Sequence, residues 1–214
     1  MATRVKVCGI TRAVDAELAL SLGADFLGTI VYPKSPRAVA LDAVPSLLDC
    51  IPQGKRVVVD VAPSPERVEA LMALGFDYFQ FHFDLDISMA TVAAWSEMIG
   101  PERLWLAPRV PSDEANFPQI LMEFADTILL DAFDKNAYGG TGISGENWQR
   151  FLDCTVLYQH KNWVLAGGLS PDNIKEALAF TQAGIIDVNS GVESAPGIKD
   201  PDKLRDLFKR VKGE

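Results

Sequence analysis

The segment Leu22-Gly23-Ala24-Asp25-Phe26 joins the end of a helical pattern to the start of an apolar, strand-like run. Two later segments, Leu74-Gly75-Phe76-Asp77-Tyr78 and Gln182-Ala183-Gly184-Ile185-Ile186-Asp187, stand at the same kind of junction. Their glycines are spaced by close to two and then four steps of about 27 residues, roughly the length of a strand, a helix and two short loops. About eight such units fit into the chain, and sustained strand–helix alternation predicts a parallel sheet closed into a (β/α)8 TIM barrel.

Eight runs are predicted to form the strands: Val5–Cys8, Phe26–Val31, Arg56–Asp60, Tyr78–His82, Leu104–Ala107, Thr127–Leu130, Trp163–Ala166 and Ile186–Asn189. Clear helical patterns follow the first, third, fourth, seventh and eighth runs. After the fifth run, Asp113–Phe124 contains Pro118, so a helix is expected to begin near that proline rather than cross it. After the sixth run, a glycine-rich stretch leaves only Trp148–Leu152 as a short helix.

The whole chain, residues 1–214, is expected to form one barrel domain, because no linker or low-complexity segment divides it. An open doubly wound sheet is the alternative arrangement of the same units. Eight units in 214 residues leave little beyond minimal loops, which favours the barrel.

Composition excludes several classes of function. The net charge of -9 and the lack of clustered Lys and Arg argue against nucleic-acid binding. The apolar runs are far shorter than the ~20 residues that span a bilayer, and no run of signal-peptide length follows the N-terminus. Three cysteines without CxxC or CxxH spacing indicate neither a disulfide framework nor a structural zinc site. We expect a cytoplasmic protein that binds no membrane.

Candidate catalytic residues come just after the predicted strands, because active sites of such barrels lie at the carboxyl ends of the strands. Cys8 ends the first strand, although a cysteine there is often only a small buried apolar residue. Asp131 follows the sixth strand as a carboxylate on the rim, where capping a loop is the alternative role. Arg37 follows two prolines in the second loop and could bind a carboxylate through its planar guanidinium. His82 has no surrounding cluster of metal-ligating residues.

Two glycine-rich loops follow the last two strands. Gly167-Gly168 precedes Pro171, which suits the first position of a helix, and helix-start amides favour a phosphate. Asn189-Ser190-Gly191 adds amides and a hydroxyl from the neighbouring strand. The loops after strands seven and eight recur as a phosphate site in this architecture, so we predict a phosphate there. The alternative is that these glycines only permit tight turns.

Six motifs occur in an order that closely resembles phosphoribosylanthranilate isomerase of tryptophan biosynthesis. They are Lys6-Val7-Cys8-Gly9-Ile10-Thr11, Ser35-Pro36-Arg37, Leu129-Leu130-Asp131, Tyr138-Gly139-Gly140-Thr141-Gly142, Leu165-Ala166-Gly167-Gly168-Leu169 and Asp187-Val188-Asn189-Ser190-Gly191-Val192-Glu193. The resemblance covers nearly the whole chain. It implies a TIM barrel and an Amadori rearrangement of N-(5-phosphoribosyl)anthranilate without metal or cofactor.

The resemblance also implies roles for single residues. Cys8 matches the family's general base, Asp131 its general acid and Arg37 its ligand for the anthranilate carboxylate. The Gly168 and Ser190-Gly191 loops match its phosphate site. The other predicted substrate contacts are His82, Gly140, Gly142, Gly167 and Asn189.

The chemistry is consistent with these residue types. Asp131 would protonate the ribose ring oxygen and open the ring to an iminium, and Cys8 would then remove the C2′ proton. The resulting enolamine would tautomerise to the ketone. A carboxylic acid with a pKa of ~3.9 is only ~0.1% protonated at pH 7, so Asp131 needs a raised pKa, most simply from desolvation. A thiol with a pKa of ~8.5 is only a few per cent thiolate at that pH.

Some positions depart from the family pattern. The segment Ile143–Trp148 is one residue longer than usual and lacks a Phe-Asp pair, and Phe83 replaces a Gly that follows the fourth strand, where it would crowd the pocket rim.

One alternative function is a catalytically silent phosphate-ligand binder. Another is a histidine-pathway phosphoribosyl isomerase, although such enzymes carry Asp in place of Cys8 and need a second phosphate site. The expected partner is a phosphorylated small molecule, and the chain is expected to be a monomer or homodimer.

Overall fold

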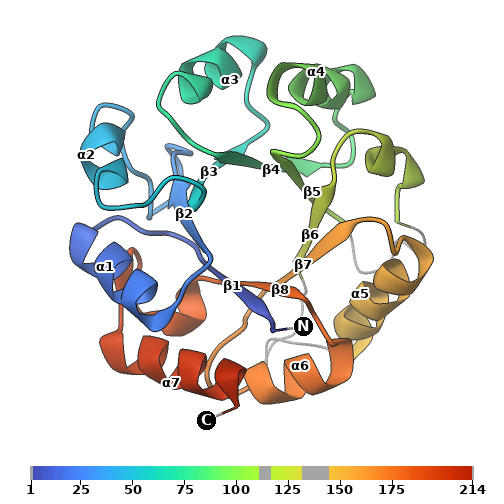
Figure 1. Cartoon of the computed structure of the whole chain (residues 1–214). Coiled ribbons are helices and arrows are strands. Elements are labelled where there is room, and N and C mark those ends of the chain that lie inside the picture. Colours follow the sequence, from blue (N-terminus) through green and yellow to red (C-terminus); the bar gives the residue numbers. More distant parts are fainter. Residues whose placement is uncertain (1, 111–116, 132–144, 214) are drawn as a thin grey trace.

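Eight parallel strands close into a barrel in the order of the sequence, from β1 to β8 (Figure 1). This closed arrangement confirms the predicted (β/α)8 barrel. The computed structural model describes residues 2–110, 117–131 and 145–213. Its strands are β1 (Arg4–Val7), β2 (Phe26–Ile30), β3 (Arg56–Val61), β4 (Tyr78–Asp84), β5 (Leu104–Arg109), β6 (Thr127–Asp131), β7 (Asn162–Ala166) and β8 (Ile185–Val188). A small hairpin of β9 (Glu193–Ala195) and β10 (Ile198–Lys199) follows β8.

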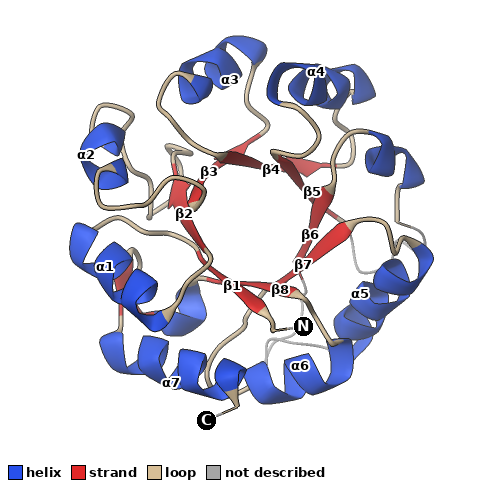
Figure 2. Cartoon of the chain, viewed as in Figure 1, coloured by secondary structure: helices blue, strands red, loops and turns tan. Residues whose placement is uncertain are grey.

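Helices form an outer ring around the strands (Figure 2). They are α1 (Ala13–Leu22), α2 (Val44–Leu48), α3 (Pro65–Met72), α4 (Met89–Ile99), α5 (Gly145–Leu157), α6 (Ile174–Thr181) and α7 (Pro201–Lys212), with short 3-10 helices η1 (Gln119–Glu123) and η2 (Ser190–Val192). No described helix is both long and apolar enough to cross a lipid bilayer.

Three helix predictions need correction or completion. The helix after β5 begins next to Pro118 as predicted, but it is only the 3-10 turn η1. Helix α5 is much longer than the predicted Trp148–Leu152, because Cys154 continues the buried stripe of Trp148 and Phe151 by another turn. Helix α2 was not predicted; it is only five residues long, too short to show a helical pattern in the sequence.

The repeated Gly-x-Asp segments work in the same way at two places in the barrel. Gly23 and Gly75 adopt left-handed conformations at the ends of helical segments, with φ of 99° and 87°. The aspartates that follow accept hydrogen bonds from amides in the first two residues of the preceding strands. Asp25 Oδ2 lies 2.8 Å from the Val5 nitrogen, and Asp77 Oδ2 lies 2.9 Å from the Arg56 nitrogen. The repeat therefore ends a helix and fixes the start of a neighbouring strand.

Strand alternation divides the core into two layers. Alternate side chains of each strand pack outward against the helices, and they form the larger cluster with Val5, Val7 and Leu27. The others point into the barrel, where Phe26, Tyr78 and Trp105 pack edge to face or tilted, with ring centroids 5.0–5.6 Å apart. Cys8 belongs to this inner cluster. The inner layer therefore forms the floor beneath the carboxyl ends of the strands.

Candidate active site

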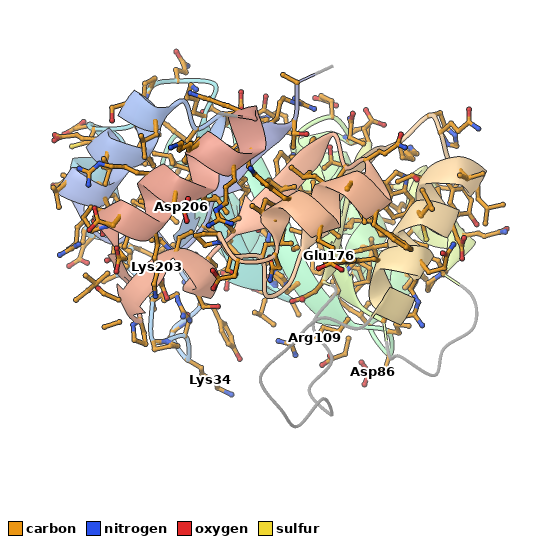
Figure 3. All side chains as sticks on the ribbon, turned by 90° about the horizontal axis from the view of Figure 1, so that it is seen from below. Lys34, Asp86, Arg109, Glu176, Lys203 and Asp206 are labelled. Carbon is orange, nitrogen blue, oxygen red and sulfur yellow. The ribbon has the colours of Figure 1, made fainter. Side chains whose placement is uncertain are left out.

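Two neighbouring cavities open at the carboxyl ends of the strands. The first has a volume of about 280 Å³, and the predicted residues that line it are Cys8, His82, Asp131, Gly167, Gly168, Asn189, Ser190 and Gly191. The second has a volume of about 320 Å³, and the further residues that line it include Tyr32, Ser35, Pro108 and Arg109. Both cavities share Ile30, Val59, His82, Leu129 and Asp131. Lys34, Asp86 and Arg109 project from this same edge of the molecule (Figure 3).

Cys8 follows β1 directly and lies at the bottom of the first cavity. Its side chain is almost fully buried, and burial raises the pKa of the thiol, against the lowering effect of the Lys6 ammonium. The strand ends at Val7, one residue earlier than predicted. A side chain at Gly28 of β2 would collide with Cys8 Sγ and with Lys6 Nζ, at 2.9 and 3.0 Å from the added carbon. Gly28 therefore leaves room for both groups.

A buried ion pair lies inside the barrel beside Cys8. Lys6 and Asp187 are register partners on β1 and β8, and Lys6 Nζ lies 2.9 Å from Asp187 Oδ2. Burial is the largest single influence and lowers the pKa of Lys6, but the negative partners Asp187 and Cys8 together outweigh it, so the pKa is raised. Burial also raises the pKa of Asp187, and Lys6 offsets this only in part. Asp187 Oδ1 has no hydrogen-bond partner among the described residues, so Lys6 satisfies only one of the two carboxylate oxygens.

The two predicted phosphate loops touch each other. Gly167 and Gly168 have left-handed φ angles of 91° and 61°, which turn the chain back over the end of β7. Gly191, in η2, lies so close to the backbone carbonyl of Leu169 that a side chain at Gly191 would overlap it. The contact joins the loop after β7 to the loop after β8 into one wall of the first cavity.

The predicted helix start at Pro171 is wrong, because α6 begins only at Ile174. The Asn173 side chain instead stabilises a turn that precedes α6. Its Oδ1 accepts a hydrogen bond from the Ser170 nitrogen at 2.9 Å, and its Nδ2 donates to the Gly168 carbonyl at 2.9 Å. These side-chain bonds compete with helical bonding and hold the loop as a turn. The wall is thus built from loop backbone and η2 rather than from the first turn of α6.

Asp131 and His82 stand where the two cavities meet. Asp131 is exposed at the end of β6, so the desolvation expected for a general acid is not supplied by burial in the described structure. His82 is half-buried, and burial, followed by the positive charges of Lys6 and Arg109, lowers its pKa to about 4. The Gln80 amide nitrogen lies 2.9 Å from His82 Nε2, which suits a neutral ring that accepts a hydrogen bond. His82 is therefore an uncharged polar group at neutral pH.

Arg37 lies beside the site but outside the residues that line either cavity. Its side chain packs against Gly9, which has a left-handed φ of 71° and no room for a side chain between Arg37 and Asn189. Arg37 Nε and Nη2 both donate to the Glu193 carboxylate, which raises the pKa of Arg37. If Arg37 binds a substrate carboxylate through Nε and Nη2, these atoms must share their hydrogen bonds between the substrate and Glu193, or break those to Glu193.

Two other predictions fall outside the site. Gly140 and Gly142 lie outside the described residues. Phe83 does not crowd the pocket rim, because β4 continues to Asp84 and the alternation turns Phe83 outward. Its ring packs against Trp95 of α4, with the centroids 5.7 Å apart.

Several polar residues of the site were not predicted from the sequence. Lys6, Gln80 and Asp187 point into the barrel, and Arg109 lines the second cavity. The alternation in Lys6-Val7-Cys8 could have revealed Lys6, because it places this lysine on the same strand face as the candidate thiol. Among the described residues, no group of three or more His, Cys, Asp or Glu side chains is arranged to hold a metal ion.

Comparisons with known proteins agree with this geometry. The sequence model of the family described as N-(5'phosphoribosyl)anthranilate (PRA) isomerase matches residues 5–210. The N-(5'-phosphoribosyl)anthranilate isomerase of Aquifex aeolicus is 37% identical over 214 residues, covering 99% of both chains. The structure of phosphoribosyl anthranilate isomerase from Thermotoga maritima superposes with a TM-score of 0.78 at 29% identity, over 99% of this chain and 100% of that one. Another solved structure is a phosphoribosyl anthranilate isomerase in complex with reduced 1-(o-carboxyphenylamino)-1-deoxyribulose 5-phosphate. It superposes with a TM-score of 0.75 at 27% identity, over 99% of this chain and 100% of that one.

Proposed function

The chain belongs to the N-(5'-phosphoribosyl)anthranilate isomerase family, and from that premise we propose how its own residues carry out the reaction. The family performs an intramolecular aldose–ketose rearrangement in tryptophan biosynthesis, and this chain is such an isomerase. Its substrate is a phosphorylated small molecule. The assignment of individual residues to steps, and of substrate parts to cavities, is the proposal.

One observation carries the proposal: the two cavities meet at Asp131 and His82, with Cys8 in the first cavity. The phosphate would lie against the joined loops of Gly168 and Gly191, where backbone amides can donate to it. The anthranilate ring would occupy the second cavity, beside Tyr32 and apolar side chains. The ribose would then span the junction, which places its ring oxygen and C2′ between the two proposed catalytic groups.

In this arrangement Asp131 is the general acid and Cys8 the general base. Asp131 gives its proton to the ribose ring oxygen as the C1′–O bond breaks, and the nitrogen lone pair forms the iminium. The Cys8 thiolate then takes the C2′ proton, and the C–H electron pair moves into the C1′–C2′ bond and neutralises the iminium. The enolamine tautomerises to the ketone. No metal or cofactor is needed, because the iminium accepts the electrons.

The structure changes how Asp131 would work. Asp131 is exposed on the rim, so the desolvation that favours the protonated form of a carboxyl would have to come from the bound substrate. The neutral His82 can donate or accept a hydrogen bond at the same junction without adding a positive charge that would oppose protonation of Asp131.

Arg37 is the proposed ligand for the anthranilate carboxylate, on the side of the site next to Gly9. Arg109 is a second candidate, because it lines the second cavity and is only loosely held by Asp84 at 3.4 Å. Gly140 and Gly142 stay proposed substrate contacts, as do Gly167, Asn189 and Ser190. We further propose a cytoplasmic location, which the three unpaired cysteines support, and a single barrel domain that acts as a monomer or homodimer.

The test is turnover of freshly generated phosphoribosylanthranilate by purified wild type, Cys8→Ala and Asp131→Asn. Each variant should lose at least ~10²-fold in kcat, the scale of an acid–base group. Cys50→Ala and Asp86→Asn are matched controls, since Cys50 lies outside the residues that line the cavities and Asp86 is exposed on the same edge of the barrel. Wild-type rates in both site variants, with the controls also unchanged, would contradict these residue roles.

A further inference from the structure

Lys6 lies in an unusual place for a charged side chain. Residues two apart on a strand face the same side, so Lys6 and Cys8 both point into the barrel. The Lys6 side chain is fully buried there, and its ammonium and the Cys8 sulfur crowd the same space above Gly28. The surrounding inner cluster is largely apolar, with Phe26 and Val57 among its members.

The fold does not require this charge. Removing two ions from water is energetically costly, and an apolar pair of similar size often stabilises a protein as well as a buried ion pair does. Lys6 and Asp187 lie opposite each other at a position where two apolar side chains could continue the inner core. A buried pair at this position next to a candidate base calls for a functional explanation.

The charges that face Cys8 come from several elements. The nearest pair is Lys6 on β1 and Asp187 on β8. Two further cations also interact with the thiol electrostatically, Lys199 of β10 and Arg37 after β2. The cavity that Cys8 lines is also lined by His82 and Asp131. Lys199 and Arg37 already share the Glu193 carboxylate, whose charge offsets theirs. Lys6 also faces a carboxylate, but its ammonium shares the space above Gly28 with the thiol, and it lowers the pKa of Cys8 more than Lys199 does.

We propose that Lys6, oriented by Asp187, is the positioning residue that stabilises Cys8 as the thiolate which accepts the substrate proton. The inference rests on the proposed function, because it assumes that Cys8 is the base. When the S–H bond forms and the C2′–H bond breaks, Lys6 keeps its own proton, so it acts only through the charge of the sulfur. Asp187 has the opposite electrostatic effect on the thiol, because its carboxylate raises the pKa of Cys8 while the Lys6 ammonium lowers it.

The test is a titration of the Cys8 thiolate that needs no turnover. The ultraviolet thiolate absorbance is followed against pH, and the signal of Cys8→Ser is subtracted to remove Cys50 and Cys154. Lys6→Met should raise the pKa of Cys8 and lower the thiolate fraction at neutral pH about tenfold, the equivalent of one pKa unit. Asp187→Asn should move the pKa of Cys8 the opposite way. Shifts of opposite sign would show that both members of the pair act on the thiol through their charges.

Activity gives a second readout. In Lys6→Met the acidic limb of the kcat–pH profile should move up in pH by the same amount as the thiolate titration, with KM nearly unchanged. If Lys6→Met does not fold, Lys6→Met combined with Asp187→Leu replaces the pair by apolar side chains and should still raise the pKa of Cys8. An unchanged pKa of Cys8 in the folded variant would overturn the proposal. Wild-type turnover in Cys8→Ser would instead refute the general-base role, and the titration would still report the effect of Lys6.

Discussion

Arg37 and Glu193 are 156 residues apart in the chain, yet their side chains form three hydrogen bonds. Arg37 Nε lies 3.0 Å from each carboxylate oxygen, and Nη2 lies 2.7 Å from one of them. Lys199 Nζ donates to the same carboxylate at 2.9 Å. Glu193 therefore ties the loop after β2 to the segment after β8, directly beside the proposed catalytic thiol.

Glu193→Gln should destabilise the protein strongly. The change leaves the buried Lys199 without its anionic partner, and removal of one member of a buried pair costs about 3 kcal/mol. Burial alone would raise the pKa of Glu193, but Arg37 and Lys199 lower it below its ordinary value. The stabilisation is therefore present above the ordinary pKa of glutamate and is lost as the pH falls through the lowered one. Urea unfolding at several pH values measures both effects.

Asp202→Asn is the matched control for that experiment. Asp202 pairs with Arg205 at 3.0 Å, but both side chains are more than half exposed. Exposed pairs contribute little, so the free energy of unfolding should change by less than about 0.5 kcal/mol. Equal losses in Glu193→Gln and Asp202→Asn would show that the buried network does not stabilise the fold.

Arg37→Ala and Arg109→Ala should separate the two candidate carboxylate ligands. We expect Arg37→Ala to raise KM about tenfold or more, since a charged hydrogen bond to the substrate contributes roughly 1.5–3 kcal/mol. Arg109→Ala should raise KM only a few-fold, because Arg109 is exposed on the rim. Steady-state kinetics measure both. The reverse order would identify Arg109, and not Arg37, as the ligand of the carboxylate.

His82→Gln should flatten the pH dependence of stability. Burial, together with the charges of Lys6 and Arg109, lowers the pKa of His82 to about 4, whereas an unfolded histidine titrates near ~6.5. The unfolded state binds more protons between these values, so the free energy of unfolding of the wild type should fall as the pH falls from about 6.5 to about 4. The contribution is roughly 2 kcal/mol for this half-buried ring.

The measurement for His82 is urea unfolding at neutral and at mildly acidic pH in wild type, His82→Gln and His160→Gln. His160→Gln is the control variant, because His160 is the other histidine and its side chain is exposed. If His82→Gln loses as much stability as the wild type over that range, other groups cause the loss.

Gly191→Ala should weaken phosphate binding. The added methyl group would overlap the Leu169 carbonyl, so the two loops that form the cavity wall would have to separate. We expect KM to rise about tenfold or more, since displacements near 1 Å can cost as much as 10²-fold. Gly184→Ala is the control, because nothing lies within 4 Å of the added atom. Calorimetric titration with inorganic phosphate gives a readout independent of turnover, and unchanged phosphate affinity in Gly191→Ala would argue against this wall as the phosphate site.

Much of the fold could be predicted because its strands are apolar and evenly spaced. All eight strands lie within two residues of their predicted bounds at each end. The errors occurred where side chains compete with backbone bonding or where a pattern is short. Asn173 delays α6 past Pro171, α2 is too short to read, and α5 continues past Leu152 because Cys154 remains on its buried face.

The sequence alone determined the barrel and the order of its strands, because the hydrophobic pattern and the Gly-x-Asp junctions are local features. It also placed Cys8, Asp131 and the two glycine loops at strand ends, so the closure of the barrel brings them around one cavity. Only the tertiary structure decided which charges meet. Lys6 reaches Asp187 181 residues away, and Arg37 after β2 reaches Glu193 after β8, because closure of the barrel pairs β1 with β8. Partners so distant in sequence leave no local pattern, and their burial and charge balance exist only once the barrel has formed.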